Sequence, residues 1–115
     1  MASASAQLEP GGREDLAKLA QSLREISAEI PEDVPWVLQI NGHTDRRPIA
    51  TFEFPSNWEL STARAINVGR VLIQEGIPPE RIAVAGFAEF QPLDDRRDEI
   101  AYRRNRRIEI KLTTP

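Results

Sequence analysis

The chain has 115 residues, of which 40% are hydrophobic and 29% charged, a composition that is ordinary for one soluble globular domain. Its net charge of −3 argues against nucleic acid as a partner, because nucleic-acid binding usually needs a basic face. Cysteine is absent, which excludes disulfide bonds and a thiol nucleophile. Arginine pairs occur at residues 46–47, 96–97, 103–104 and 106–107, interleaved with acids, and we interpret most of them as solvated surface.

A first helix is predicted from residue 13 to Pro31, because apolar residues recur there at alternating steps of three and four. Glu14 and Asp15 suit the positive end of its dipole. The apolar stripe, which is expected to face the core, consists of Leu16, Leu19, Leu23, Ile26 and Ile30.

The sequence predicts three strands, two from alternating apolar and polar residues and one from a continuous apolar run. Residues 36–41 alternate as a half-buried strand should, and residues 107–112 do the same. Residues 81–87 form a short apolar run, which favours an interior position in a sheet. With a short helix expected at residues 99–104, the order favours an α+β fold, a mixed sheet with helices packed on one face.

A second helix is predicted from Ser56 to about Glu75. Ser56 and Glu59 have the spacing of a capping box, and Gly76 follows as the C-terminal glycine. On a helical wheel Arg64 falls inside the apolar arc, between Val68 and Val71. A buried arginine needs an anionic partner, and this one lies near the positive end of its own helix.

Asp45 is the natural partner, because it follows the strand that leads into this helix. Two interpretations remain open: an Asp45–Arg64 ion pair that only fixes the loop, or a site that binds a small zwitterion. In the second, Arg64 and the helix-start N–H groups hold a carboxylate and Asp45 holds an ammonium. Asn57 and Thr44 would add neutral hydrogen bonds.

Enzymatic interpretations are weak. His43 is the one histidine, so a histidine-rich metal site is excluded, and no cofactor is expected. The sequence has no nucleophile elbow, no glycine-rich phosphate loop and no evident pair of converging acids among Glu53, Glu59 and Glu89. We therefore predict a binding module rather than an enzyme.

Several short motifs resemble the OmpA-like peptidoglycan-binding domain found in outer membrane protein A, peptidoglycan-associated lipoprotein and the stator protein MotB. They run in family order over about residues 38–112. The motifs are Gly42-His43-Thr44-Asp45, Asn57-x-x-Leu60-Ser61-x-x-Arg64-Ala65, Gly76-Ile77-Pro78, Arg81-Ile82, Gly86-Phe87-Ala88-Glu89, Pro92 and Asn105-Arg106-Arg107-Ile108-Glu109-Ile110.

The resemblance implies a β-α-β-α-β-β sandwich that binds the diaminopimelate of the peptidoglycan stem peptide without covalent chemistry. It implies that Asp45 and Arg64 bind diaminopimelate and that Asn57 and Arg106 are further residues of the binding pocket. Thr44, Leu60 and Asn105 are implied as lining or support. The parent protein is expected to be membrane-anchored and periplasmic, either a flagellar stator or a general envelope anchor. The alternative function is that of a cell-wall enzyme, a peptidoglycan hydrolase or amidase.

Two departures from the family pattern stand out. The loop after Asp45 is long and ends in Phe54-Pro55-Ser56-Asn57-Trp58-Glu59-Leu60-Ser61, a phrase that resembles the MotB branch. The first family strand is reduced to a remnant in residues 1–7, which otherwise look like the start of an expressed fragment, while residues 8–115 form the domain. A truncated first strand would leave an exposed sheet edge, which favours a homodimer.

Overall fold

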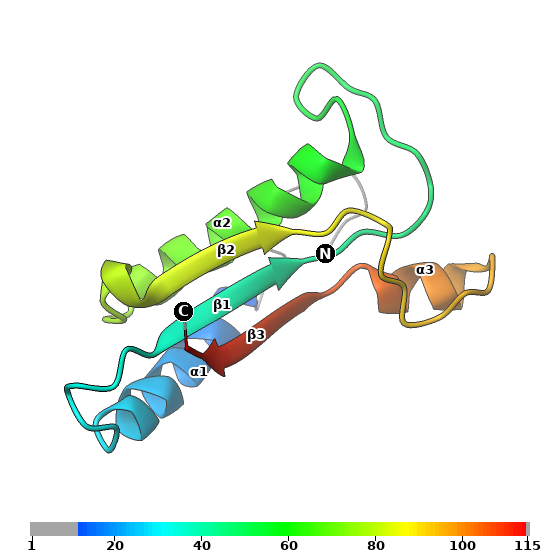
Figure 1. Cartoon of the computed structure of the whole chain (residues 1–115). Coiled ribbons are helices and arrows are strands. Elements are labelled where there is room, and N and C mark those ends of the chain that lie inside the picture. Colours follow the sequence, from blue (N-terminus) through cyan, green and yellow to red (C-terminus); the bar gives the residue numbers. More distant parts are fainter. Residues whose placement is uncertain (1–11, 115) are drawn as a thin grey trace.

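A mixed three-stranded sheet forms the centre of the computed structural model, which describes residues 12–114 (Figure 1). The strand order is β2-β1-β3. The central strand β1 (Val37–Gly42) pairs in parallel with β2 (Ile82–Gly86) and antiparallel with β3 (Ile108–Thr113). The predicted mixed sheet is therefore confirmed, while the expected remnant of a first strand lies outside the described residues.

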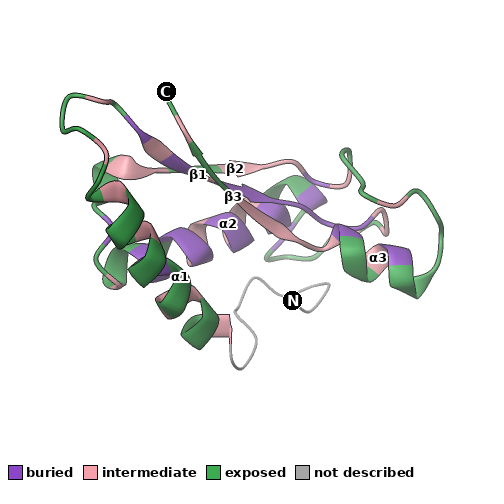
Figure 2. Ribbon diagram, turned by 90° about the horizontal axis from the view of Figure 1, so that it is seen from below, coloured by how far each residue is buried: buried purple, intermediate pink, exposed green. Residues whose placement is uncertain are grey.

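Two helices cover one face of this sheet. Helix α1 (Gly12–Ser27) and helix α2 (Asn57–Gln74) both lie under it in Figure 2, and the buried residues gather on α2 and β1. A short 3-10 turn, η1 (Pro79–Arg81), precedes β2, and α3 (Glu99–Asn105) precedes β3. Among the described residues no helix has the length and apolar character needed to cross a membrane. The α+β class and the packing of helices on one face agree with the prediction.

The core lies between β1 and α2. Leu38 and Ile40 of β1 are at most 1% exposed, as the alternation in the sequence requires for residues that face the helices. They pack in one cluster with Ala65, Val68 and Leu72 of α2. This packing fixes the direction of α2, and with it the position of the residues at its N-terminus.

Helix α1 ends earlier than predicted. The chain leaves the α-helix at Ser27, and the backbone N–H groups of Glu29 and Ile30 donate to carbonyls three residues back, at 3.1 Å each. This tighter turn ends the helix before Pro31 and still lets Ile30 reach the core. Ile26 is 52% exposed and Leu19 37%, so the five-residue stripe is only partly buried.

The prediction that residues 81–87 occupy an interior position is wrong for the described sheet, in which β2 lies at an edge. Ile82 and Val84 face α2, where both come within 3.4 Å of a Cβ built on Gly69. Ala83 and Ala85 lie on the opposite face. The run looks continuous in sequence because the outward positions carry small apolar residues rather than polar ones.

Both ends of α2 are capped as predicted. The Ser56 hydroxyl accepts from the backbone N–H of Trp58 at 3.1 Å and donates to the Glu59 carboxylate at 2.7 Å. At the other end Gly76 has a φ of +105°, a conformation that favours glycine. The Arg24 guanidinium of α1 donates to the carbonyl of Glu75, which joins the two helices.

Gly42 gives a test of how closely α2 packs on the end of β1. A Cβ at Gly42 would lie 2.1 Å from the Ser61 carbonyl oxygen, so Gly42→Ala must displace backbone. We expect Gly42→Ala to lower the free energy of unfolding by about 1–3 kcal/mol or more in urea titrations.

Gly69→Ala is the matched control. Its Cβ would meet only side-chain methyl groups at 3.4 Å, and alanine is favoured over glycine in a helix interior by about 1 kcal/mol. Equal destabilisation by the two substitutions would contradict the described packing.

Candidate functional site

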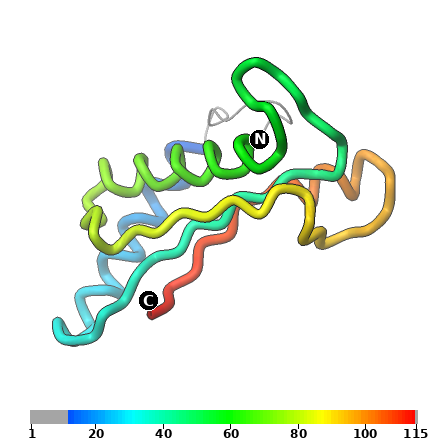
Figure 3. Tube along the Cα trace, turned by 45° about the horizontal axis from the view of Figure 1, so that its top comes forward, coloured from blue at the N-terminus to red at the C-terminus, as the bar shows by residue number. Residues whose placement is uncertain are grey.

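The polar segment that follows β1 is held rigidly. The backbone N–H of His43 donates to the Arg107 carbonyl at 3.0 Å, and that of Thr44 donates to the Ala88 carbonyl at 2.9 Å. Thr44 and Asp45 are each 4% exposed. Figure 3 shows that the loop leading into α2 and the segment from β2 through α3 lie at this same end of the molecule.

The backbone at Ala88 is held in a disfavoured conformation by hydrogen bonds to two other segments. It has a φ of +54°, which costs a non-glycine residue roughly 1–2 kcal/mol. Its backbone N–H donates to the Ser61 hydroxyl at 3.0 Å, and its carbonyl accepts from Thr44. Backbone held in a disfavoured conformation by its surroundings is typical of functional sites.

The Asp45 carboxylate is the centre of the polar site. Arg47 donates to it from its backbone N–H at 2.9 Å and from its guanidinium at 2.6 Å and 3.2 Å. Arg106 donates to the same Oδ2 atom at 2.8 Å. The Arg47 guanidinium also lies over the Tyr102 ring, 4.7 Å from its centroid.

These contacts decide the charge of Asp45. Burial raises the pKa of its carboxyl, but hydrogen bonds from Arg47 and Arg106 together lower it further, so the net pKa lies below the ordinary value of 3.8. Asp45 is therefore ionised at neutral pH. A buried, ionised carboxylate held by two arginines can accept a ligand ammonium in place of one of them.

Arg64 is fully buried, at 0% exposure, on the face of α2 where the helical wheel put it. The direct Asp45–Arg64 ion pair that the sequence left open is not formed within residues 12–114, where Asp45 pairs with Arg47 and Arg106. The physical reason is that both of these arginines have their donors already directed at the Asp45 oxygens. Asp45 is thus a buried carboxylate after the end of β1, and Arg64 is a buried guanidinium on α2.

Asn57 connects the site to the loop after β2. It is the first residue of α2, 6% exposed, and its amide donates to the Arg47 carbonyl and to a Glu89 carboxylate oxygen, each at 3.1 Å. The same nitrogen lies 3.5 Å from the Asp45 carbonyl oxygen. Asn57 therefore fixes the geometry of the site in addition to any contact that it makes with a ligand.

Of the remaining residues predicted for the site, Arg106 contacts Asp45, while Leu60 and Asn105 hold nearby loops in place. Arg106 has a side chain only 9% exposed and bridges Asp45 to Glu99, the latter at 3.1 Å. Leu60 is fully buried against Phe54, which holds down the loop before α2. Asn105 accepts from the backbone N–H groups of Leu93 and Asp94 and donates to the Asp94 carbonyl, so it shapes a loop.

Sequence reasoning missed Arg47 and Glu99. Most of the arginine pairs are interpreted from the sequence as solvated surface, yet Arg47 makes the shortest contact to Asp45, at 2.6 Å. A signal existed in its position two residues after Asp45, where a turn brings the two side chains together. Glu99 pairs with both Arg47 and Arg106, and nothing local in the sequence indicates this.

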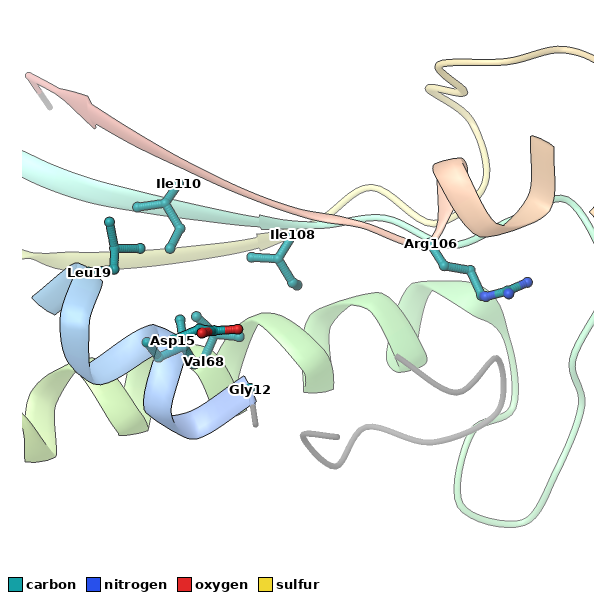
Figure 4. Close-up of a pocket in the computed structure, with 8 residues that line it drawn as sticks. Gly12, Asp15, Leu19, Val68, Arg106, Ile108 and Ile110 are labelled. Carbon is teal, nitrogen blue, oxygen red and sulfur yellow. The ribbon is translucent and has the colours of Figure 1, made fainter. Parts of the chain in front are cut away.

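A groove of about 380 Å³ runs between α1, α2 and β3 beside the site (Figure 4). Its walls are mostly apolar, and Asp15 and Arg106 are its charged residues. In Figure 4 the Arg106 guanidinium points away from the apolar side chains, so the groove adjoins the polar site without containing it. The lining residues are Gly12, Asp15, Leu16, Leu19, Val68, Arg106, Ile108 and Ile110.

His43 is placed for a structural role. It is 1% exposed, stacks on Phe87 with ring centroids 5.1 Å apart, and has its Nε2 atom 3.3 Å from a Glu109 oxygen. Burial and the nearby Arg107 lower its pKa, against the opposing effect of Glu109. The imidazole is thus neutral at neutral pH and packed against a ring and the third strand.

Comparison with known proteins identifies relatives over most of the chain. A family model described as "OmpA family" matches residues 2–106. The protein YtxE of Bacillus subtilis is 37% identical over 88% of this chain and 42% of its own length. Motility protein B of the same organism is 34% identical over 77% of this chain and 34% of its own length.

A third relative, the peptidoglycan-associated lipoprotein of Pseudomonas aeruginosa, is 33% identical over 63% of this chain and 40% of its own length. The chain thus spans less than half the length of these curated relatives. Among solved structures, the C-terminal domain of Helicobacter pylori MotB superposes with a TM-score of 0.86 at 23% identity, covering 100% of this chain and 83% of that one. This likeness supports the fold.

Asp45 predicts a specific loss of stability in acid. Because its pKa is lowered on folding, its ionised form stabilises the protein above the ordinary value of 3.8, and this stabilisation is lost as pH falls towards the folded pKa. We expect the urea midpoint of the wild type to fall more steeply below about pH 4 than that of Asp45→Asn, which cannot take up that proton.

The exposed Asp95 supplies the control, because Asp95→Asn removes a carboxylate of the same type from the surface. It should keep the wild-type pH profile. A wild-type profile in Asp45→Asn as well would show that Asp45 is not held as the contacts describe.

Proposed function

The chain belongs to the OmpA family, and from that premise we propose that it binds peptidoglycan non-covalently through the diaminopimelate of the stem peptide. In this proposal it holds a membrane-attached parent protein to the cell wall from the periplasm. A relative named peptidoglycan-associated lipoprotein supports the ligand. A relative named Motility protein B makes a flagellar stator component the specific candidate for the parent.

The observation that carries the proposal is a set of buried charges of both signs at one end of the fold. Asp45 is 4% exposed, Arg64 0%, and the Arg106 side chain 9%. Burying charges costs folding free energy, and hydrophobic residues of similar volume would often be as stable or more so. A ligand that carries opposite charges gives a reason to keep them.

Diaminopimelate has an amine and a carboxylate on one carbon, which matches this set. Asp45 accepts from the ammonium, and the guanidinium groups of Arg64 and Arg106 donate to the carboxylate. Thr44 and Asn57 hold the surrounding backbone in place. Their hydrogen bonds to the chain itself mean that the site is formed before the ligand arrives, which lowers the entropy cost of binding.

The ligand ammonium must compete with Arg47. The Arg47 side chain is 41% exposed, so it can move towards solvent while Arg106 stays in place. The ligand thereby exchanges one cation on Asp45 for another, and the buried carboxylate is never left without a counter-ion.

The rival function, hydrolysis of the cell wall, finds less support. His43 contacts Phe87 and Glu109, and Asp45 is held ionised by arginines, which makes it a poor general acid. Incubation with purified sacculi separates the two functions. Pelleting without release of soluble fragments supports binding, and turnover would contradict it.

A homodimer is a secondary part of the proposal. Within residues 12–114 each of β2 and β3 pairs with β1 on one side, which leaves the other edge of each for a second copy.

Substitutions at Asp45 and Arg64 test the site. Asp45→Ala and Arg64→Lys should each reduce the fraction of protein that pellets with sacculi by roughly tenfold or more, because a charge-assisted hydrogen bond to the ligand is worth about 1.5–3 kcal/mol. Lysine at position 64 keeps the charge and loses the bidentate geometry.

The matched control is Asp95→Ala, an exposed aspartate that should pellet like the wild type. Circular dichroism must show that all three variants are folded. Normal pelleting of both site variants would remove Asp45 and Arg64 from the proposal.

Substitution of Arg47 is expected to increase ligand affinity, in contrast to substitution of Asp45 or Arg64. Arg47→Ala removes the competitor for Asp45, so the affinity for a diaminopimelate-containing tripeptide should rise by about two- to tenfold in calorimetry.

Arg96→Ala is a close control, because Arg96 makes the same kind of pair with an aspartate two residues earlier, at 2.7 Å, on the surface. It should leave the affinity unchanged. A large loss of affinity in Arg47→Ala would mean that Arg47 contacts the ligand instead of giving way to it.

A further inference from the structure

Two exposed aromatic rings lie together beside the candidate site. Trp58 in the first turn of α2 is 50% exposed, and Phe90 in the loop after β2 is 65% exposed. Their ring centroids are 5.3 Å apart and their planes are inclined by 36°. We call Trp58 and Phe90 the aromatic pair. Single exposed apolar residues are common on protein surfaces, but two neighbouring rings in a tilted arrangement form a defined apolar surface.

One hydrogen bond joins the aromatic pair to the site. Asn57 and Glu89 immediately precede Trp58 and Phe90 in the chain, and the Asn57 amide donates to the Glu89 carboxylate at 3.1 Å. The same amide donates to the Arg47 carbonyl beside Asp45. The backbone that carries the two rings therefore adjoins residues that contact the segment after Asp45.

The backbone that carries the rings is fixed. The N–H of Trp58 donates to the Ser56 cap, and its carbonyl accepts from the hydroxyls of Ser61 and Thr62 at 3.1 Å and 2.8 Å. The N–H of Phe90 donates to the Phe87 carbonyl at 3.4 Å. The backbone at both rings therefore needs no further ordering when a partner binds.

The polar groups around the aromatic pair indicate the chemistry of its partner. A shallow groove of about 340 Å³ begins at Trp58 and is lined by Glu59, Thr62, Ala63 and Ile66. Its polar residues carry a carboxylate and a hydroxyl, Glu89 adds a second carboxylate nearby, and no lining residue is basic. This arrangement disfavours phosphate, nucleic acid and anionic lipid.

A pyranose ring fits these features. Its C–H face stacks on aromatic rings, and its hydroxyl and N-acetyl N–H groups donate to carboxylate and hydroxyl oxygens at the edge. We propose that the aromatic pair binds a sugar of the peptidoglycan glycan strand while the site at Asp45 holds the stem peptide. This inference rests on the proposed function, and it adds the substrate class of a second subsite.

The covalent structure of peptidoglycan makes the two subsites cooperate. The stem peptide is attached to a sugar of the glycan strand, so once the peptide is bound the sugar is present at high effective concentration. A weak stacking interaction then contributes to affinity without needing to hold the glycan alone.

The test uses the whole chain and three ligands: glycan strands stripped of peptide, free diaminopimelate tripeptide, and the disaccharide tripeptide. Trp58→Ala and Phe90→Ala should each abolish binding to the stripped glycan and weaken the disaccharide tripeptide by roughly tenfold. Affinity for the free tripeptide should not change. Trp58→Phe should retain part of the glycan affinity.

Phe52→Ala is the matched control, because Phe52 is fully exposed in the loop before α2. It should bind all three ligands like the wild type. Unchanged binding of both glycan ligands in Trp58→Ala and Phe90→Ala would overturn the inference. So would a loss of dimer in sedimentation with glycan binding intact, since the rings would then contact a second copy.

Failure of this inference and failure of the proposed function give different results. A wild type that binds the free tripeptide and the disaccharide tripeptide with equal affinity keeps the diaminopimelate site and refutes the sugar subsite. A wild type that binds stripped glycan through Trp58 but not the tripeptide supports the sugar subsite and refutes the diaminopimelate site.

Discussion

The contact on which this end of the molecule depends is the one between Asp45 and Arg106, at 2.8 Å. It joins the end of the central strand to the junction of α3 and β3, 61 residues further along the chain. Both side chains are less than a tenth exposed, so neither charge is well solvated by water, and each needs the other. The pair therefore joins three elements at once and places a buried carboxylate and a buried guanidinium where they meet.

The rest of the site is built around that ion pair by hydrogen bonds. Asn57 brings the start of α2 against the chain that follows Asp45, and Ala88 brings the loop after β2 against Thr44. Arg64 enters the same end from within α2, fully buried. Because these anchors come from α2, the loop after β2 and the segment after α3, the fold supplies a frame for the site, in which the side chain of Arg47 is 41% exposed.

The sequence predicted what depends on local pattern. The cap at Ser56, the glycine after α2, the buried position of Arg64 and the end of the strand before Asp45 all follow from periodicity and turn chemistry. It could not predict contacts between distant segments, such as Asn57 with Glu89, and it misplaced the apolar strand β2, whose outward alanines imitate burial. The role of Arg106 came from the family resemblance, because nothing near residue 106 indicates that it meets Asp45.

The central claim is that the site recognises an amine and a carboxylate on the same carbon. Calorimetric titration of the wild-type chain with two tripeptides, one ending in diaminopimelate and one in lysine, tests it most directly, since lysine lacks only the second carboxylate. Loss of a charge-assisted hydrogen bond should weaken the lysine peptide by roughly tenfold to a hundredfold. Equal affinities for the two peptides would contradict the account.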